Sequence, residues 1–232
     1  TNVIDPFDLD SDGVPDINDT DDDNDGILDT QDTVIGNKNH VSTNLANLVV
    51  KVNGSGNITS PTGLQNVSFF NDSKPLVSFT WNFTPDNPLK MYNISIEVQS
   101  NNSAGFIVVK GINLSQLNTT KTVYIDNVNA SRNKTCVKDA ETTTISEITQ
   151  TCSGANEYVL PCPGNVSSYS CVVVGDRFKI TGLLHSAVIQ IKHYCGDGIC
   201  SAFENCISCS SDCGSCPSSS GICRKRAVRL GG

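Results

Sequence analysis

The amino-terminal segment repeats one aspartate-rich pattern at a spacing of 13 residues. Each copy has aspartates at relative positions 1, 3, 5, 9 and 12 and a glycine at position 6. A hard cation such as Ca²⁺ takes about six to eight oxygen ligands, and a loop of chain offers them from those five positions and from the carbonyl at position 7. The spacing predicts two calcium-binding loops, with Ca²⁺ as the cofactor and these ligands: Asp8, Asp10, Asp12, Val14, Asp16, Asp19, Asp21, Asp23, Asp25, Ile27, Asp29 and Asp32.

The loops differ from EF-hands because no helices flank them. Pro6 and Pro15 interrupt the chain, and the second copy begins two residues after the first ends. Tandem loops of this kind resemble the thrombospondin type 3 repeat over residues 5–32, without that family's interleaved cysteines. The resemblance implies a rod of calcium sites that wraps around metal instead of an apolar core. Dockerin modules share the aspartate pattern, but helices separate their loops.

The charge of this leader supports the same interpretation. Residues 1–32 hold 12 acidic residues and no Lys or Arg, whereas the rest of the chain holds 12 acidic and 16 basic residues. The net charges are therefore −12 and +4. The alternative is a disordered acidic leader. Either way, we expect the segment to be unfolded without cations, and the loop interpretation predicts that cations stiffen it.

Size and composition limit the remaining classes. A chain of 232 residues forms one large domain or two to three small ones. It has no apolar run near the ~20 residues of a membrane helix and no signal peptide. We therefore expect no membrane insertion, and a processed or truncated start before residue 1. The acidic balance also argues against nucleic acid as a partner, because the basic cluster at 224–229 is confined to the tail.

Behind the leader and a polar linker at 33–44, apolar and polar residues alternate. The clearest runs have as their apolar members Val77, Phe79, Trp81 and Phe83, and then Tyr92, Ile94, Ile96 and Val98. This period predicts half-buried antiparallel strands. Further strands are expected at 45–52, 64–70, 106–112 and 122–128. Together they indicate an all-β fold of the immunoglobulin-like β-sandwich type, and no stretch has a helical period.

The glycan acceptor signal Asn-x-Ser/Thr occurs 13 times, where composition alone predicts about five. We expect N-linked glycans at Asn53, Asn57, Asn66, Asn71, Asn82, Asn93, Asn101, Asn113, Asn118, Asn129, Asn133 and Asn165. Asn82 and Asn93 are placed on the outward faces of their strands. Asn18 is expected to stay unmodified because a metal loop surrounds it. The alternative is an Asn- and Thr-rich composition that carries no sugar.

Eleven cysteines follow residue 135. Beside calcium loops and glycan signals, they indicate disulfides formed in an oxidising compartment. Pairing Cys136 with Cys152, and Cys162 with Cys171, closes a hairpin-sized loop in each case. The count is odd, and Cys223 is the candidate for the unpaired thiol.

Residues 195–216 form a compact module that contains Cys195, Cys200, Cys206, Cys209, Cys213 and Cys216. So short a segment needs disulfides because it encloses little core. It resembles the CGDG-type repeat of secreted microbial proteins, and the runs at 136–141 and 176–188 resemble segments of archaeal surface proteins. The six cysteines allow 15 connectivities. A further calcium site at Asp197, Glu204 and Asp212, a solvated acidic surface, and a zinc site at the closely spaced cysteines remain alternatives.

These patterns divide the chain into five parts. They are the calcium loops at 1–36, a glycosylated β-sandwich at 37–128, a β-rich disulfide-containing region at 129–194, the cysteine-rich module at 195–216, and a linker with a basic tail at 217–232.

No catalytic motif stands out. The three histidines lie apart, without a zinc-protease motif, nucleophile elbow or phosphate loop. His185 with Ser186, together with the carboxylates Asp139, Glu141 and Glu147, would need tertiary structure to converge. Cys206 and Cys209 lack the βαβ setting of a redox pair. We expect a protein that is not an enzyme.

The expected function is that of an extracellular, calcium-stabilised structural glycoprotein at the cell surface, in a filament or a surface layer. Its expected partners are copies of itself in a head-to-tail assembly, since contacts that do not close give fibres. One alternative is a monomeric adhesin or carbohydrate-binding module on a calcium stalk. Another is an ancillary region of a secreted hydrolase.

Overall fold

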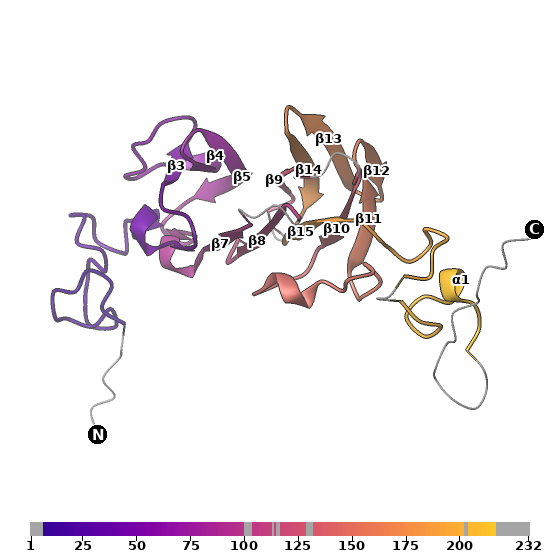
Figure 1. Ribbon diagram of the computed structural model, residues 1–232. Coiled ribbons are helices and arrows are strands. Elements are labelled where there is room, and N and C mark those ends of the chain that lie inside the picture. Colours follow the sequence, from indigo (N-terminus) through magenta and orange to yellow (C-terminus); the bar gives the residue numbers. More distant parts are fainter. Residues whose placement is uncertain are drawn as a thin grey trace, which may run out of the picture.

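The structure, a computed structural model, describes residues 7–99, 104–112, 114, 117–128, 132–201 and 204–216. The chain runs from the aspartate-rich leader at one end, through two large sheets, to the cysteine-rich module at the other end (Figure 1). The prediction of a mostly β chain is confirmed. None of the helices in the described part has the length and apolar character needed to cross a bilayer.

The larger sheet has seven strands in the order β12-β13-β14-β9-β5-β4-β3. All its neighbours pair antiparallel. Its strands are β3 (Leu48–Val52), β4 (Gly63–Asn71), β5 (Lys74–Phe83), β9 (Lys121–Asp126), β12 (Gly164–Val166), β13 (Tyr169–Val174) and β14 (Arg177–Leu183).

The second sheet has six strands in the order β11-β10-β15-β8-β7-β2, and only the β2–β7 pair is parallel. Its strands are β2 (Ser42–Thr43), β7 (Ser95–Val98), β8 (Phe106–Lys110), β10 (Lys134–Lys138), β11 (Glu157–Pro161) and β15 (Ala187–Ile191). A short parallel pair joins β1 (Val34–Ile35) to β6 (Leu89–Lys90). The described helical turns are η1 (Lys38–His40), η2 (Met91–Asn93), η3 (Ile145–Glu147) and α1 (Ser210–Cys213).

The two large sheets share one apolar core. Alternate residues of β5 and β7 enter it, as the period of two predicts, and Phe79, Phe83 and Ile96 are almost fully buried. Trp81 is only partly buried against this core, and its Nε1 donates to the carbonyl of Asn87 at 3.1 Å. Tyr92 is also half-exposed, since the chain there forms η2 instead of a strand.

The boundary expected at residue 128 does not break either sheet. Strands β10, β11 and β15 extend the sheet that contains β7 and β8, while β13 and β14 extend the sheet that contains β5 and β9. The core likewise combines residues from both sides of this position, such as Val123 and Phe178. The described residues of 37–128 and of 132–194 therefore form one body.

The start of the expected polar linker is buried. Val34 and Ile35 are each 4 % exposed and form β1, and the backbone N–H of Leu89 donates to the carbonyl of Thr33 at 2.8 Å. Two consecutive apolar residues in a polar stretch do not distinguish a short buried strand from a loop in the sequence. The leader is consequently joined to the sheets by a packed segment.

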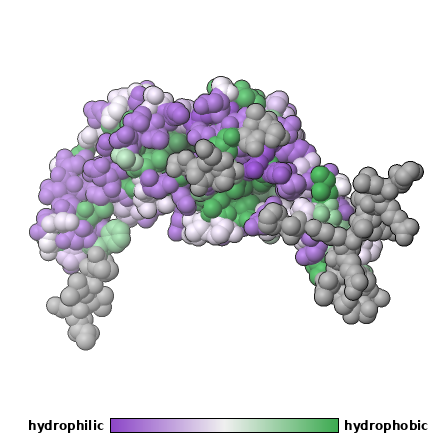
Figure 2. All heavy atoms as spheres, in the orientation of Figure 1, coloured by the Kyte–Doolittle hydropathy of each residue, from purple (hydrophilic) through white to green (hydrophobic). Residues whose placement is uncertain are grey.

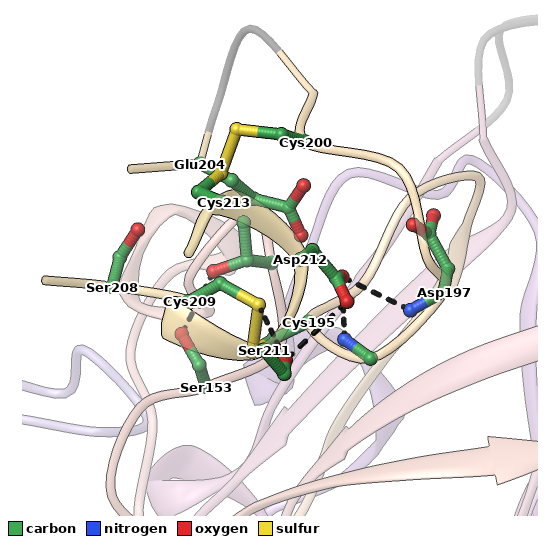
Figure 3. The surroundings of a disulfide bond; sticks show 12 residues. Ser153, Cys195, Asp197, Cys200, Glu204, Ser208, Cys209, Ser211, Asp212 and Cys213 are labelled. Carbon is green, nitrogen blue, oxygen red and sulfur yellow. Dashed lines mark hydrogen bonds between the residues drawn. A yellow bond between two sulfur atoms is a disulfide. The ribbon is translucent and has the colours of Figure 1, made fainter. Parts of the chain in front are cut away.

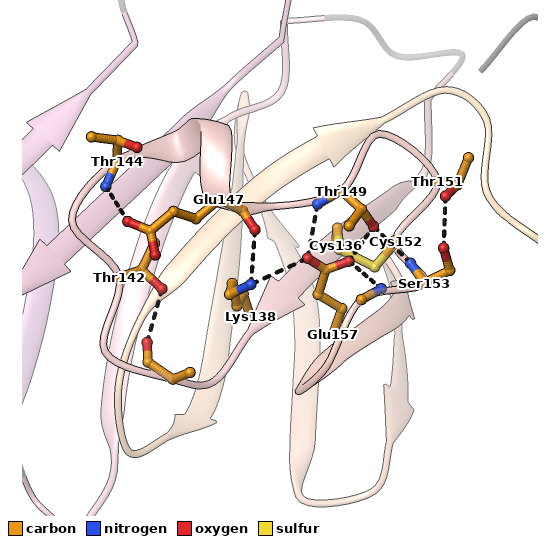
Figure 4. Close-up of polar contacts among 12 residues, drawn as sticks. Cys136, Lys138, Thr142, Thr144, Glu147, Thr149, Thr151, Cys152, Ser153 and Glu157 are labelled. Carbon is orange, nitrogen blue, oxygen red and sulfur yellow. Dashed lines mark hydrogen bonds and ion pairs between the residues drawn. A yellow bond between two sulfur atoms is a disulfide. The ribbon is translucent and has the colours of Figure 1, made fainter. Parts of the chain in front are cut away.

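A smaller apolar cluster covers the outer face of the six-stranded sheet, where the 139–153 loop lies over β10 and β15. The Cys136–Cys152 disulfide ties the loop to β10. Figure 4 shows Glu157 on β11 holding the loop, as it accepts from the backbone N–H groups of Thr149 and Gly154, each at 2.8 Å. Lys138 donates to the carbonyl of Glu147 at 2.8 Å. The loop is fixed to the sheet at several points.

Lys121 is an exception to the apolar core. Its side chain is fully buried, and its Nζ donates to the carbonyl of Ile112 at 2.7 Å. Burial lowers the pKa of Lys121 to about 8, and the carboxylates of Glu141 and Asp139 oppose this shift. The folded protein therefore holds a charged amine that is better solvated in the unfolded chain.

We expect Lys121→Met to raise stability at pH 7 and to remove a pH dependence. The folded pKa lies below the unfolded value of 10.5, so unfolded chains bind more protons between these values and wild-type stability rises with pH from about 8 to 10.5. The free energy of unfolding of the wild type rises by at most about 3 kcal/mol over this pH range. In Lys121→Met the lost hydrogen bond to Ile112 costs about 1 kcal/mol, which offsets part of the stability that the variant gains at pH 7. Urea unfolding of both proteins at pH 7 and pH 9.5 tests this. Parallel pH profiles would contradict it.

Candidate calcium-binding loops

The two aspartate loops have the same backbone conformation. Ser11 and Asn24, and the glycines at position 6, have positive φ angles, 96° at Gly13 and 93° at Gly26. In each loop the position-6 glycine donates to the aspartate at position 1, and the residue at position 7 donates to the aspartate at position 5. These bonds are Gly13 N to Asp8 Oδ2 at 3.1 Å, Gly26 N to Asp21 Oδ2 at 3.0 Å, Val14 N to Asp12 Oδ1 at 2.8 Å and Ile27 N to Asp25 Oδ1 at 2.9 Å.

The first three aspartates of each loop converge. One carboxylate oxygen from each of these residues lies within 4.8 Å of the others, which gives two clusters: Asp8, Asp10 and Asp12, and Asp21, Asp23 and Asp25. Several of these oxygens are buried and have no hydrogen-bond partner, namely Asp8 Oδ1, Asp10 Oδ2 and Asp21 Oδ1. Three ionised carboxylates this close repel one another, and a divalent cation offsets both the repulsion and the missing bonds. The donor set, all oxygen, suits Ca²⁺.

The aspartates at positions 9 and 12 lie outside these clusters. At position 9, Asp16 Oδ1 accepts from Leu9 N at 2.9 Å, and Asp29 Oδ1 accepts from Asp22 N at 3.0 Å. At position 12, Asp19 and Asp32 each accept from the next two backbone N–H groups with Oδ1. In each case these backbone N–H groups bond to Oδ1, and the bonds close the loops.

Asp22 lies near the position-9 aspartates of both loops, and the sequence did not predict this. Its Oδ1 is buried without a partner. Burial, followed by the nearby charges of Asp29 and Asp16, raises the pKa of Asp22 to about 6. In the first loop Leu9 occupies the corresponding position, so the 13-residue repeat did not single out this aspartate. The signal was the run of three aspartates at 21–23.

The leader is bonded to the sheets. Asp23 Oδ2 accepts from Gly36 N at 2.5 Å, and Asp32 is 1 % exposed beneath β1. Burial raises the pKa of both carboxyl groups against the backbone hydrogen bonds that lower it. The ring of Phe7 also lies 5.3 Å from the ring of Tyr92, between centroids. The second loop is thereby linked directly to the body of the protein.

Most of the described glycan acceptors lie on the surface. Asn53, Asn57, Asn66, Asn93, Asn118, Asn133 and Asn165 are exposed, and Asn71 and Asn82 are half-buried. Asn93 is exposed from η2, instead of from the outward face of a strand as expected. Asn101, Asn113 and Asn129 lie outside the described residues, as do Cys223 and the basic tail.

Five disulfides connect ten cysteines. Two join Cys136 to Cys152 and Cys162 to Cys171, the pairs expected from the spacing. In the cysteine-rich module the first cysteine pairs with the fourth, the second with the fifth and the third with the sixth: Cys195–Cys209, Cys200–Cys213 and Cys206–Cys216. All six module sulfurs are thus in disulfides, which leaves no thiolate among them for zinc or for redox exchange.

The acidic residues of the module act within its fold (Figure 3). Asp212 accepts from the backbone N–H groups of residues 196–198, at 2.6 to 3.2 Å. Desolvation raises the pKa of its carboxyl group, but these bonds together outweigh it, and the pKa lies below its usual value. Glu204 accepts from Ser201 N at 2.8 Å, and Asp197 pairs with His193 at 3.4 Å. These bonds hold the turns between the disulfides.

The residues considered for catalysis converge only in part. His185 Nδ1 lies 3.2 Å from Glu141 Oε2, and Asp139 Oδ1 accepts from His185 N at 2.6 Å. The hydroxyl of Ser186 is fully buried without a partner, and Glu147 instead accepts from residues 143 and 144 in the turn before η3. The contacts of Asp139 and Glu141 with His185 hold the 139–141 segment against the residues that precede β15.

Comparison of the chain with protein-family models, curated proteins and solved structures finds no significant match.

Proposed function

We propose that this protein is a non-enzymatic extracellular structural glycoprotein, a calcium-stabilised subunit of a surface filament or surface layer. The observation that carries the proposal is the pair of equivalent loops, in which buried carboxylate oxygens converge without hydrogen-bond partners. Asp8, Asp10 and Asp12 would hold one ion, and Asp21, Asp23 and Asp25 another. Bound Ca²⁺ supplies positive charge that offsets carboxylate repulsion and fixes the loops. The resemblance to thrombospondin type 3 repeats supports the same role.

The remaining features favour an extracellular location. Disulfides form and persist in oxidising compartments, and the described residues form five of them. The exposed glycan acceptors agree with an N-glycosylated surface. Two sheets around one core support the expectation of an immunoglobulin-like β-sandwich, and the three disulfides of the carboxyl-terminal module suit a CGDG-type repeat.

The shape of the molecule favours a linear assembly. The calcium loops and the cysteine-rich module lie at opposite ends of the two sheets (Figure 1). Bonds from Asp23 and Asp32 to the segment before β2 would make the loaded leader a stiff extension of the body. A stiff subunit whose two ends differ can associate head to tail, and such contacts generate filaments when they do not close.

Electron microscopy of the purified protein tests this proposal. In millimolar calcium we expect filaments or sheets with a regular repeat, and excess chelator is expected to disperse them. Magnesium at the same concentration is the control, because it demands a tighter octahedral geometry than these loops offer. Monodisperse particles in both calcium and chelator, at concentrations where the protein stays soluble, would refute the assembly.

A further inference from the structure

An apolar groove opens on the outer face of the six-stranded sheet, between the 139–153 loop and β15. Its volume is about 460 Å³, and four isoleucines line it: Ile145, Ile148, Ile189 and Ile191. Ile145 and Ile189 are only partly buried against the small outer cluster. Figure 2 shows apolar side chains gathered in a hollow in the middle of this face. The loop thus leaves part of the cluster uncovered.

The polar lining of the groove combines neutral side chains, such as Gln150 and Gln190, with two cationic ones. The cationic ones are Arg132 and Lys192, and Lys192 is exposed. His193 is beside them and pairs with Asp197. Such a groove suits a segment that combines an apolar side chain with a carboxylate.

One exposed glycan acceptor, Asn133, follows Arg132, which lines the groove. From residue 134 to the end of the chain, Asn165 is the single Asn-x-Ser/Thr asparagine, and it lies on β12 in the other sheet. Acceptors are concentrated instead at β3 to β5 and the turns around them.

We propose that the groove binds the amino-terminal segment of a second copy, with Val3 and Ile4 on the isoleucines and Asp5 against Lys192 and Arg132. This segment joins two β-branched apolar residues to a carboxylate, and it begins a leader with a net charge of −12. The inference rests on the proposed assembly and names its contact. The groove lies in the half of the body next to the cysteine-rich module, whereas the leader extends from the opposite end (Figure 1). The contact is therefore heterologous and open, as a filament requires.

Charge reversal tests the contact in the full chain. Lys192→Glu and Asp5→Lys are each expected to raise the critical concentration for assembly about tenfold, because like charges then face each other. The double variant restores the opposite charges and is expected to assemble within about twofold of wild type. Lys74→Glu, at an exposed position on β5, is the matched control and is expected to leave assembly unchanged.

The outcomes separate this inference from the proposed function. If wild type assembles and neither single variant changes its critical concentration, the groove is not the contact, although the assembly stands. If wild type does not assemble, the proposed function fails. Binding of a labelled peptide of residues 1–8 then tests whether the groove takes the amino-terminal segment. Binding of that peptide to wild type and about tenfold weaker binding to Lys192→Glu would support the groove. Equal binding to both proteins, or no binding, would overturn it.

Discussion

Removing divalent cations is expected to unfold residues 7–32 and to leave both large sheets folded. The segment holds 11 aspartates and no basic residue. Its apolar side chains do not form a core, since Phe7, Ile17 and Leu28 are 47 %, 76 % and 47 % exposed. Without metal, no positive charge offsets the repulsion between the carboxylates of each loop, and this repulsion favours the unfolded segment. Hydrogen exchange in calcium and in chelator measures this, with fast exchange expected only in the leader after chelation.

Variants in one loop at a time test which aspartates bind calcium in that loop. Asp21→Asn with Asp23→Asn is expected to weaken calcium binding at the second loop at least about 100-fold, because two charges beside the ion are lost. Asp8→Asn with Asp10→Asn should do the same at the first loop. Asp72→Asn removes an exposed carboxylate from the β4–β5 turn and is the control. Calorimetric titration that shows the same heat in all four proteins would contradict the assignment of these ligands.

Gly182→Ala is expected to destabilise the sheets by about 3 kcal/mol or more. Gly182 has a φ of 96° at the register shift of β14, between Thr181 and Leu183. A Cβ there would lie 2.2 Å from the carbonyl oxygen of Ser168. The left-handed backbone and the clash with main chain act together, because neither can relax without moving β13 or β14. Chemical denaturation gives the change in the free energy of unfolding.

Gly175→Ala separates the two causes. Gly175 has a φ of 61° in the β13–β14 turn, and a Cβ there meets nothing within 4 Å. This variant carries the backbone cost alone, about 1 kcal/mol. Similar losses for the two variants would show that the close approach of Ser168 contributes nothing.

The sequence alone determined the local features. The 13-residue repeat of aspartates and glycine specified two equivalent loops, because the conformation of such a loop depends on the spacing of these residues along a short stretch of chain. Alternation of apolar and polar residues located β4, β5, β8 and β9 to within a few residues, because a strand with one buried face imposes that period. The pairs Cys136–Cys152 and Cys162–Cys171 were accessible for the same reason, since each spans a short stretch.

Only the tertiary structure decided what depends on distant segments meeting. It joined residues 37–128 and 129–194 in shared sheets, selected one connectivity for the cysteine-rich module and placed Asp22 beside Asp29 and Asp16. It also buried Lys121 and left the isoleucine groove uncovered. Strand order and burial arise from the packing of the whole chain, which periodicity and spacing within one segment do not encode.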